Sequence, residues 1–196
     1  MILCLDLSSK CSGWSKFSRD GKLMDKGRIT PSPEINSLMK IHYLVGKIEQ
    51  LYTGVDELVI EDIFLNTRFA NVDVLKYLAR ISGAVIFSWI NEKYKIPHFY
   101  MANRARPLAG IKGNSHKAEV QLFVAQKYGY GTPDEREKYE YMILQMVTQH
   151  KAKDIKTSKF KYRMGKISEL IDVEIGIGED TADSIILGLA YVKENS

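Results

Sequence analysis

Residues 2–14, ILCLDLSSKCSGW, determine how the rest of the chain is interpreted. The apolar run at 2–5 predicts a short buried strand, and this strand ends on a carboxylate, Asp6. The small and polar residues after Asp6 predict a turn, and a second strand is expected over 12–18. The chain therefore opens with a strand that carries an acid at its C-terminal end.

Strands alternate with helices after this opening. Asp20-Gly21 is a hairpin turn signal, so strands at 2–6, 12–18 and 22–29 are expected to form an antiparallel meander. Further strands are expected at 57–61 and 96–101, and helices from Ser32 (N-cap, before Pro33), over 72–93, from Ser115 to about 128, from Thr132 to about 150, and from about Asp180. This order predicts an α/β fold with a mixed central sheet and helices on both faces, in a single domain spanning 1–196.

Four carboxylates have related placements along these elements. Asp6 and Glu61 each end a predicted strand, and open α/β sheets bind ligands beyond the carboxyl ends of their strands. Asp180 and Asp183 are three residues apart, which places them on one face of the first turn of a helix. Each acid alone also fits a structural role, such as a turn cap or, for Asp180, a helix N-cap.

The four acids together predict a metal site. Converging carboxylates repel one another unless cations neutralise them, and oxygen ligands suit Mg²⁺, with Mn²⁺ able to substitute. Two such ions about 3.5–4 Å apart can activate a water and stabilise the leaving oxygen of a phosphodiester. The expected chemistry is metal-dependent phosphodiester hydrolysis with two ions per site.

Positive charge is concentrated in one stretch of the chain. Residues 151–166 contain seven basic residues and a single Asp, a net charge of +6, whereas the whole chain has a net charge of +4. The rest of the chain is therefore slightly acidic, which favours a polyanionic partner for this stretch over a uniform basic surface. Candidate DNA-binding residues are Lys159, Lys161 and Arg163, with Arg104 and Arg106 extending the same surface, and the interleaved Phe160 and Tyr162 as stacking partners for bases.

The composition indicates the class of protein and where in the cell it is expected. With 45% hydrophobic and 27% charged residues the chain is typical of a globular protein. No apolar run is long enough to span a membrane, and the early charge at Asp6 does not fit a signal peptide. Cys4 and Cys11 have no metal-binding spacing and predict reduced thiols. We therefore expect a cytoplasmic protein without a membrane partner.

Three segments resemble the RuvC Holliday junction resolvases of the RNase H-like superfamily, in that family's order. They are ILCLDLSSKCSGWS at the start, LVIEDIF in the middle and EDTADSIILGLAY near the end, so the resemblance spans most of the chain. It implies an RNase H-like fold, a homodimer, a divalent metal, and paired nicks in opposing strands of a four-way DNA junction. Such a junction offers two equivalent strands, which matches a dimer with two equivalent sites.

The resemblance also implies roles for two further residues. The segment GNSHKAEV, residues 113–120, is similar to the one that carries a functional lysine in the family, so Lys117 would contact the scissile phosphate. Phe64 matches an aromatic residue that stacks on bases near the junction centre. Each also has an ordinary alternative: Lys117 as a solvent-facing residue and Phe64 as a core residue.

The chain departs from the family in three places. Leu7-Ser8 follows the first acid where the family usually has Pro-Gly, and Asp180 stands where many bacterial members have His. The region from about 131 to 173 is longer and forms an extended basic insertion. Such divergence is common in phage-encoded members, so we expect a bacteriophage-type resolvase of the host cytoplasm that also cleaves other branched DNA, such as forks.

Three other functions fit parts of the pattern. An actin-like phosphotransferase shares the opening Asp and hairpin but needs a second repeat of the domain, for which 196 residues leave no room. Another RNase H-like nuclease, acting on RNA–DNA hybrid or as a transposase, would share the acids. A non-catalytic branched-DNA-binding protein would not need the complete acid set.

Overall fold

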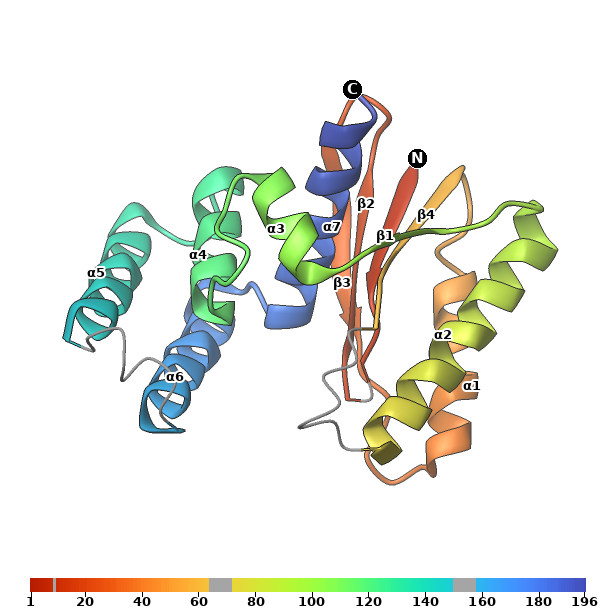
Figure 1. The fold of residues 1–196 in the computed structure, drawn as a ribbon, viewed down its shortest axis with the longest axis horizontal. Coiled ribbons are helices and arrows are strands. Elements are labelled where there is room, and N and C mark those ends of the chain that lie inside the picture. The colour runs from red at the N-terminus through yellow and green to blue at the C-terminus, as the bar shows by residue number, and fades with distance from the viewer. Residues whose placement is uncertain (9, 64–71, 150–157) are drawn as a thin grey trace.

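The computed structural model describes residues 1–8, 10–63, 72–149 and 158–196, with Gln149 and Lys159 described by their backbone alone (Figure 1). Phe64, the residue expected to stack on bases, lies outside the described residues, as do 150–157 of the basic stretch.

A five-stranded mixed sheet forms the centre of the described structure, in the order β3-β2-β1-β4-β5. The strands are β1 (Ile2–Asp6), β2 (Ser12–Phe17), β3 (Leu23–Ile29), β4 (Glu57–Glu61) and β5 (His98–Tyr100). β1, β2 and β3 pair antiparallel, whereas β4 is parallel to both β1 and β5. The predicted antiparallel meander followed by parallel strands is confirmed.

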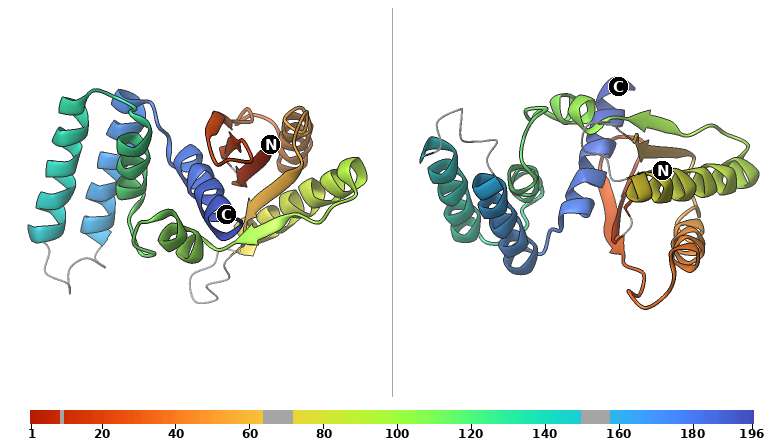
Figure 2. Two further views of the ribbon diagram at one scale, coloured as in Figure 1. Left: turned by 90° about the horizontal axis from the view of Figure 1, so that it is seen from above. Right: turned by 60° about the horizontal axis from the view of Figure 1, so that its bottom comes forward.

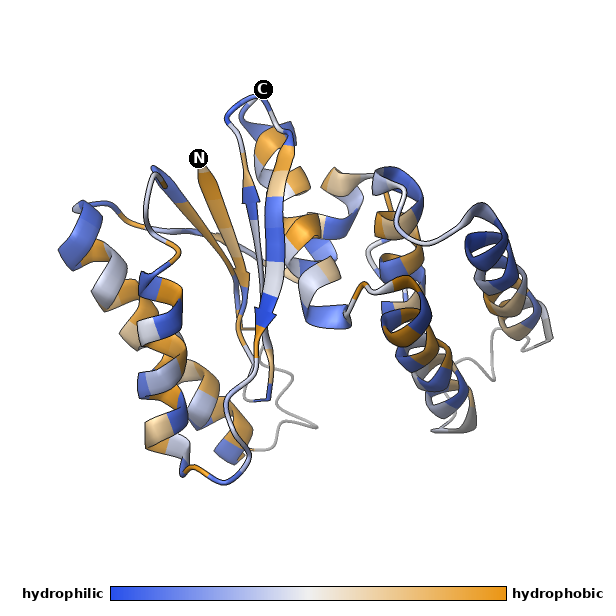
Figure 3. Cartoon of the chain, turned by 180° about the vertical axis from the view of Figure 1, so that it is seen from behind, coloured by the Kyte–Doolittle hydropathy of each residue, from blue (hydrophilic) through white to orange (hydrophobic). Residues whose placement is uncertain are grey.

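The central strand β1 is buried because helices cover both faces of the sheet. Leu3 and Leu5 pack into one core with α1 (Ser37–Glu49) and α2 (Val72–Lys93). Ile2 and Cys4 point the other way, into a core with α7 (Glu179–Glu194). Figures 1 and 2 show α1 and α2 on one side of the sheet and α7 on the other, and Figure 3 shows the apolar character of β1 and β4.

Helix α7 lies unusually close to β2. A Cβ atom at Gly13 would be 1.9 Å from the Asp180 carbonyl oxygen, and one at Gly188 would be 2.1 Å from the Phe17 ring. Only glycine permits this approach at either position. The start of α7 is therefore fixed against the strand that neighbours β1.

The other helices extend the α7 side of the molecule. α3 (Ala102–Ala109) packs on α7, and α4 (Lys117–Tyr128) also contacts α7. α5 (Pro133–Gln149) and α6 (Ser158–Ile175) pack on α4 and on each other, further from the sheet (Figure 2). No helix in the described ranges is long and apolar enough to span a membrane.

The structure differs from the predicted elements in two places. α1 begins at Ser37 with Asn36 as its N-cap, whose side chain accepts from the Met39 N–H, so Ser32-Pro33 is only a turn before it. α3 was not predicted, because a polar sequence that contains Pro107 does not indicate a helix. The helix is short and ends at Gly110, which has the left-handed backbone conformation.

We expect Gly13→Ala to destabilise the protein by about 1–3 kcal/mol, because the added methyl group would push the first turn of α7 away from β2. Gly83→Ala in α2 is the matched control: its Cβ would have nothing within 4 Å, so it should stabilise the helix by about 0.5–1 kcal/mol. Urea unfolding of both variants measures the difference. Equal stability of the two variants would contradict the close contact.

Candidate active site

Two of the predicted acids meet at one edge of the sheet. The parallel register aligns Leu5 with Ile60, so Asp6 and Glu61 follow on adjacent strands at their C-terminal ends. Both side chains are partly buried, and they share a hydrogen bond, which requires a proton on one of the two carboxyl groups. This confirms the expected geometry of the two strand-end acids.

Helix α7 brings the other two acids to the same edge. Asp6 is in register with Gly13, against which the Asp180 backbone packs. Two hydrogen bonds hold the helix there: the Ser15 hydroxyl donates to the Ser184 carbonyl at 2.9 Å, and the Thr181 hydroxyl donates to the Gly27 carbonyl at 3.1 Å. The N-cap of α7 is Gly178, so the alternative role of Asp180 as an N-cap is excluded.

The pKa of each of the four carboxyl groups is raised. Burial raises the pKa of Asp6 well above its usual value, and the charges of Glu61, Asp183 and Asp180 raise it further. Burial and the charge of Asp183 raise the pKa of Glu61 to about 7. The pKa values of Asp183 and Asp180 are also raised, mainly by burial. The folded protein therefore keeps these acids together against their electrostatic repulsion.

Lys117 lies at the N-terminus of α4 and faces this edge. Its ammonium group pairs with Glu179 and interacts electrostatically with Asp180 and Asp183. Burial alone would lower the pKa of Lys117, but the Glu179 carboxylate raises it overall, so the lysine remains charged. The side chain is 56% exposed, which leaves it accessible to a ligand at the acids.

A buried hydrogen-bond network holds Glu179 in place. The Ser168 hydroxyl of α6 lies 2.6 Å from Glu179 Oε1 and 2.5 Å from Gln121 Oε1. The Gln121 amide donates to the carbonyls of Ser168 and Ile177 at 3.2 and 2.8 Å. The network thus joins α4, α6 and the start of α7 behind Lys117.

The two arginines of α3 point to different places. Arg106 turns inward: its Nη2 lies 3.3 Å from Asp183 Oδ1, and its side chain is only 15% exposed. Arg104 pairs with Glu194 at 2.5 Å, at the far end of α7 from Asp180. Arg106 therefore does not extend an exposed basic surface, whereas the DNA-binding role of the exposed Arg104 stays a prediction.

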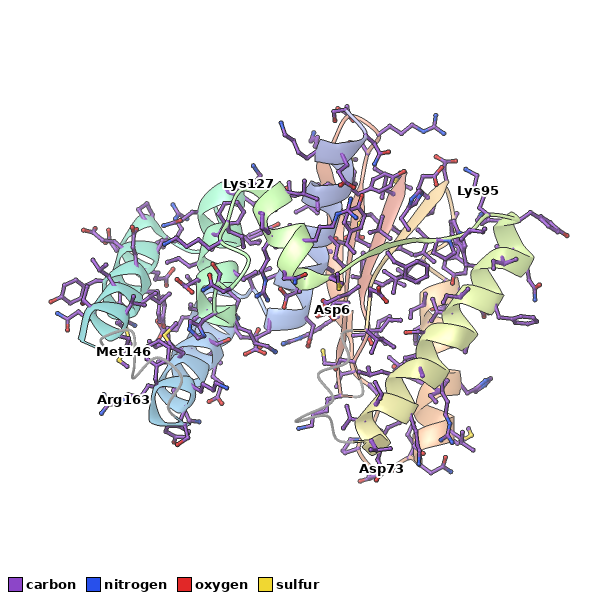
Figure 4. The ribbon with its side chains drawn as sticks, in the orientation of Figure 1. Asp6, Asp73, Lys95, Lys127, Met146 and Arg163 are labelled. Atoms are coloured by element: carbon purple, nitrogen blue, oxygen red, sulfur yellow. The ribbon has the colours of Figure 1, made fainter. Side chains whose placement is uncertain are left out.

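The basic residues of α6 divide in a similar way. Lys161 and Lys117 line one hollow of about 130 Å³, next to Glu179. Arg163 lines an apolar groove between α5 and α6 instead, away from Asp6 (Figure 4). Phe160 is fully buried against His116, so its expected role in base stacking was wrong, whereas Tyr162 is exposed.

The chemistry of the acids fits a divalent cation, because they are buried oxygen donors whose repulsion a cation would relieve. Across the described ranges, no group of three or more His, Cys, Asp and Glu side chains is already arranged to hold one ion. The present contacts explain this: Asp6 is hydrogen-bonded to Glu61, and Arg106 engages Asp183. A bound cation would replace these contacts.

Three residues of the site were not among the predicted site residues. Glu179 adjoins Asp180 in the sequence, its partner Ser168 lies on α6, and Gln121, which contacts Ser168, lies on α4. Their sequence neighbourhoods carry no motif, since the contacts span 11 and 47 residues. Helical spacing offers a partial signal, because Gln121 lies one turn after Lys117.

We expect Glu61→Gln to stabilise the metal-free protein at pH 8 by about 1–3 kcal/mol. The folded-state pKa of Glu61, about 7, lies above its ordinary value of 4.5, so the stability that its protonated form contributes is complete below pH 4.5 and is lost as the pH rises through 7. Glutamine keeps the neutral form at every pH. Denaturant unfolding in EDTA at pH 8 and pH 4.5 should show a gain at the higher pH and little change at the lower.

Glu57→Gln, at the other end of β4, is the control for this measurement. Burial raises the pKa of Glu57, but hydrogen bonds from Lys95 and His98 lower it overall, so this substitution should not stabilise the protein at pH 8. A loss of stability in Glu61→Gln at pH 8 would show that the acids do not repel one another.

Comparison with known proteins identifies the fold. No family model matches the chain, and no curated protein sequence matches it. Two solved structures match it over nearly its whole length. Thermus thermophilus RuvC in complex with a Holliday junction substrate has a TM-score of 0.58 and 8% identity, over 99% of this chain and 93% of that chain. A second Thermus thermophilus RuvC structure has a TM-score of 0.59 and 11% identity, over 99% of this chain and 94% of that chain. The chain therefore has the RNase H-like fold of RuvC.

Proposed function

We propose that this protein is a structure-selective endonuclease that resolves four-way DNA junctions and other branched DNA by metal-dependent hydrolysis. The observation that carries the proposal is the convergence of Asp6, Glu61, Asp180 and Asp183 at one edge of the sheet. The fold supports it, since one similar structure is a RuvC bound to a Holliday junction substrate.

The acids would hold Mg²⁺ or Mn²⁺, with two ions per site. When bound, the ions supply an activated water and a stabilised leaving oxygen. Asp6 and Glu61, on adjacent strands, and Asp183, on α7, would be the main ligands, and Asp180 would complete the set. Their protons would leave as the cation binds, because a ligating carboxylate must be deprotonated.

Lys117 would act on the phosphate. Its accessible ammonium group interacts with Asp180 and Asp183, and it would stabilise charge that develops on a non-bridging oxygen. Lys161 lines the same hollow and would contact a neighbouring phosphate of the same strand. The chain would thus hold the DNA backbone from α4 and α6 while the acids direct the reaction.

We further propose that the active form is a homodimer. A four-way junction has two strands to cut at symmetric positions, and each chain supplies one set of acids. Two copies related by a two-fold axis would therefore place the two sites on opposing strands.

Wild-type protein should make symmetric paired nicks in a labelled four-way junction in Mg²⁺, and Asp6→Asn should cut at least about 100-fold more slowly, because it removes a metal-binding carboxylate. Junction binding, measured in Ca²⁺ by gel shift, should change less than about threefold. The exposed Asp25 on β3 provides the control, and Asp25→Asn should cleave normally.

A Y-fork, a duplex and an RNA–DNA hybrid in the same assay separate the alternatives. Preferred cleavage of the hybrid would indicate a ribonuclease instead, and binding without cleavage of any substrate would indicate a non-catalytic DNA-binding protein. Full nicking by Asp6→Asn would refute the metal site.

Replacing Lys159, Lys161 and Arg163 together with glutamine should flatten the salt dependence of junction binding, by up to about one unit of log–log slope for each lost phosphate contact. The matched control removes three charges from the opposite side of the sheet, by Lys40→Gln, Lys47→Gln and Arg80→Gln in α1 and α2. Fluorescence anisotropy from 50 to 300 mM salt measures both. The same slope in the two triple variants would exclude α6 from DNA binding.

A further inference from the structure

Arg106 is a partly buried cation in direct contact with the acid cluster. Its guanidinium contacts Asp183, whose side chain is only 12% exposed, and its charge lowers the pKa of both Asp183 and Glu61. The arginine lies on α3, a helix that the sequence did not predict. The acid cluster is therefore the feature that accounts for a charged side chain at this partly buried position.

The shorter hydrogen bond of Arg106 is to the backbone of Ser115 and not to Asp183. Nη1 donates to the Ser115 carbonyl at 2.9 Å, in the segment just before α4. The Nη2–Asp183 distance of 3.3 Å is longer than the roughly 2.7–2.9 Å of a strong charge-assisted hydrogen bond. The guanidinium would therefore keep its place if Asp183 turned toward another cation.

Arg106 also retains a buried donor that is not used. Among the described residues its Nε has no hydrogen-bond partner. Such a group is costly unless something compensates for it, and here the compensation is the negative charge of the acids. The position of Arg106 thus reflects electrostatic attraction to the cluster more than complete hydrogen bonding.

The Arg106 guanidinium and a divalent cation would compete for the carboxylate of Asp183. Arg106 contacts Asp183 through Oδ1, and a cation bound to the same carboxylate would lie close to the guanidinium, so the two positive charges would repel in a partly buried site.

We propose that Arg106 is the resident counter-charge of the acid cluster, which competes with a divalent cation for Asp183 and so sets the metal concentration that the site requires. The inference rests on the metal site of the proposed function. In this role Arg106 is a positioning residue: it keeps Asp183 oriented in the metal-free protein and yields the carboxylate when the cation binds.

The test measures metal binding without DNA. Mn²⁺ is titrated into the full-length protein and the free ion is followed by electron paramagnetic resonance. Arg106→Met keeps most of the side-chain volume but removes the charge, and it should bind Mn²⁺ about tenfold more tightly than the wild type. Arg104→Met removes an arginine from the same helix that pairs with Glu194, and it should bind Mn²⁺ as the wild type does.

Arg106→Lys separates charge from shape. Lysine retains the positive charge without the planar guanidinium, so its Mn²⁺ affinity should stay within about threefold of the wild type. Unchanged or weaker binding by Arg106→Met would overturn the proposal, as would an Arg106→Lys variant that binds as tightly as Arg106→Met.

Asp183→Asn distinguishes failure of this inference from failure of the proposed function. It should weaken Mn²⁺ binding, and if it does not, or if the wild type takes up no Mn²⁺, the acids are not a metal site and both proposals fall. If Asp183→Asn weakens binding while Arg106→Met leaves it unchanged, only the role of Arg106 is refuted.

A measurement on the wild type covers the case in which Arg106→Met does not fold. The Arg106 Nε–H should give a slowly exchanging signal in a ¹⁵N-edited NMR spectrum, because it is buried. Saturating Mg²⁺ should shift this signal, whereas the Nε–H signal of Arg104 should not move. An Arg106 signal that is unaffected by Mg²⁺ would overturn the proposal.

Discussion

The contact between α7 and β2 at Gly13 is the constraint on which the site depends. Asp6 is in register with Gly13, and the first turn of α7 rests on that glycine, so the distance from the strand acids to the helix acids is set by backbone contact. A side chain at position 13 would separate Asp6 and Glu61 from Asp180 and Asp183, which follow Glu61 by 119 residues or more in the chain. The hydrogen bonds from Ser15 and Thr181 secure the same contact on either side.

The acid cluster destabilises the folded state when no cation is bound. Burial raises the pKa of each of the four carboxyl groups, and the charge of a neighbouring carboxylate raises it further, so the packing of β1, β4 and α7 must hold them together. Arg106 and Lys117 offset part of the repulsion. A cation that binds these carboxylates would relieve their repulsion, and this relief would add to the free energy of cation binding.

The sequence predicted those features that depend on local pattern. Strand-end acids, the spacing of Asp180 and Asp183, and the order of strands were all readable, because alternation and helical spacing are local properties. The inward turn of Arg106, the burial of Phe160 and the pairing of Lys117 with Glu179 were not readable. Each depends on which helices meet in space, and a basic or aromatic residue in a polar stretch has the same local signature whether it faces solvent or the core.

The network of Gln121, Ser168 and Glu179 has a consequence for how this protein can evolve. Because α6 supplies the hydroxyl that holds the partner of Lys117, the outer helices are not a detachable appendage of the nuclease core. An exchange of α5 and α6 between relatives would therefore also change the orientation of Lys117. Recombination within this fold would therefore have to keep α6 together with α4 and the start of α7, which these hydrogen bonds connect.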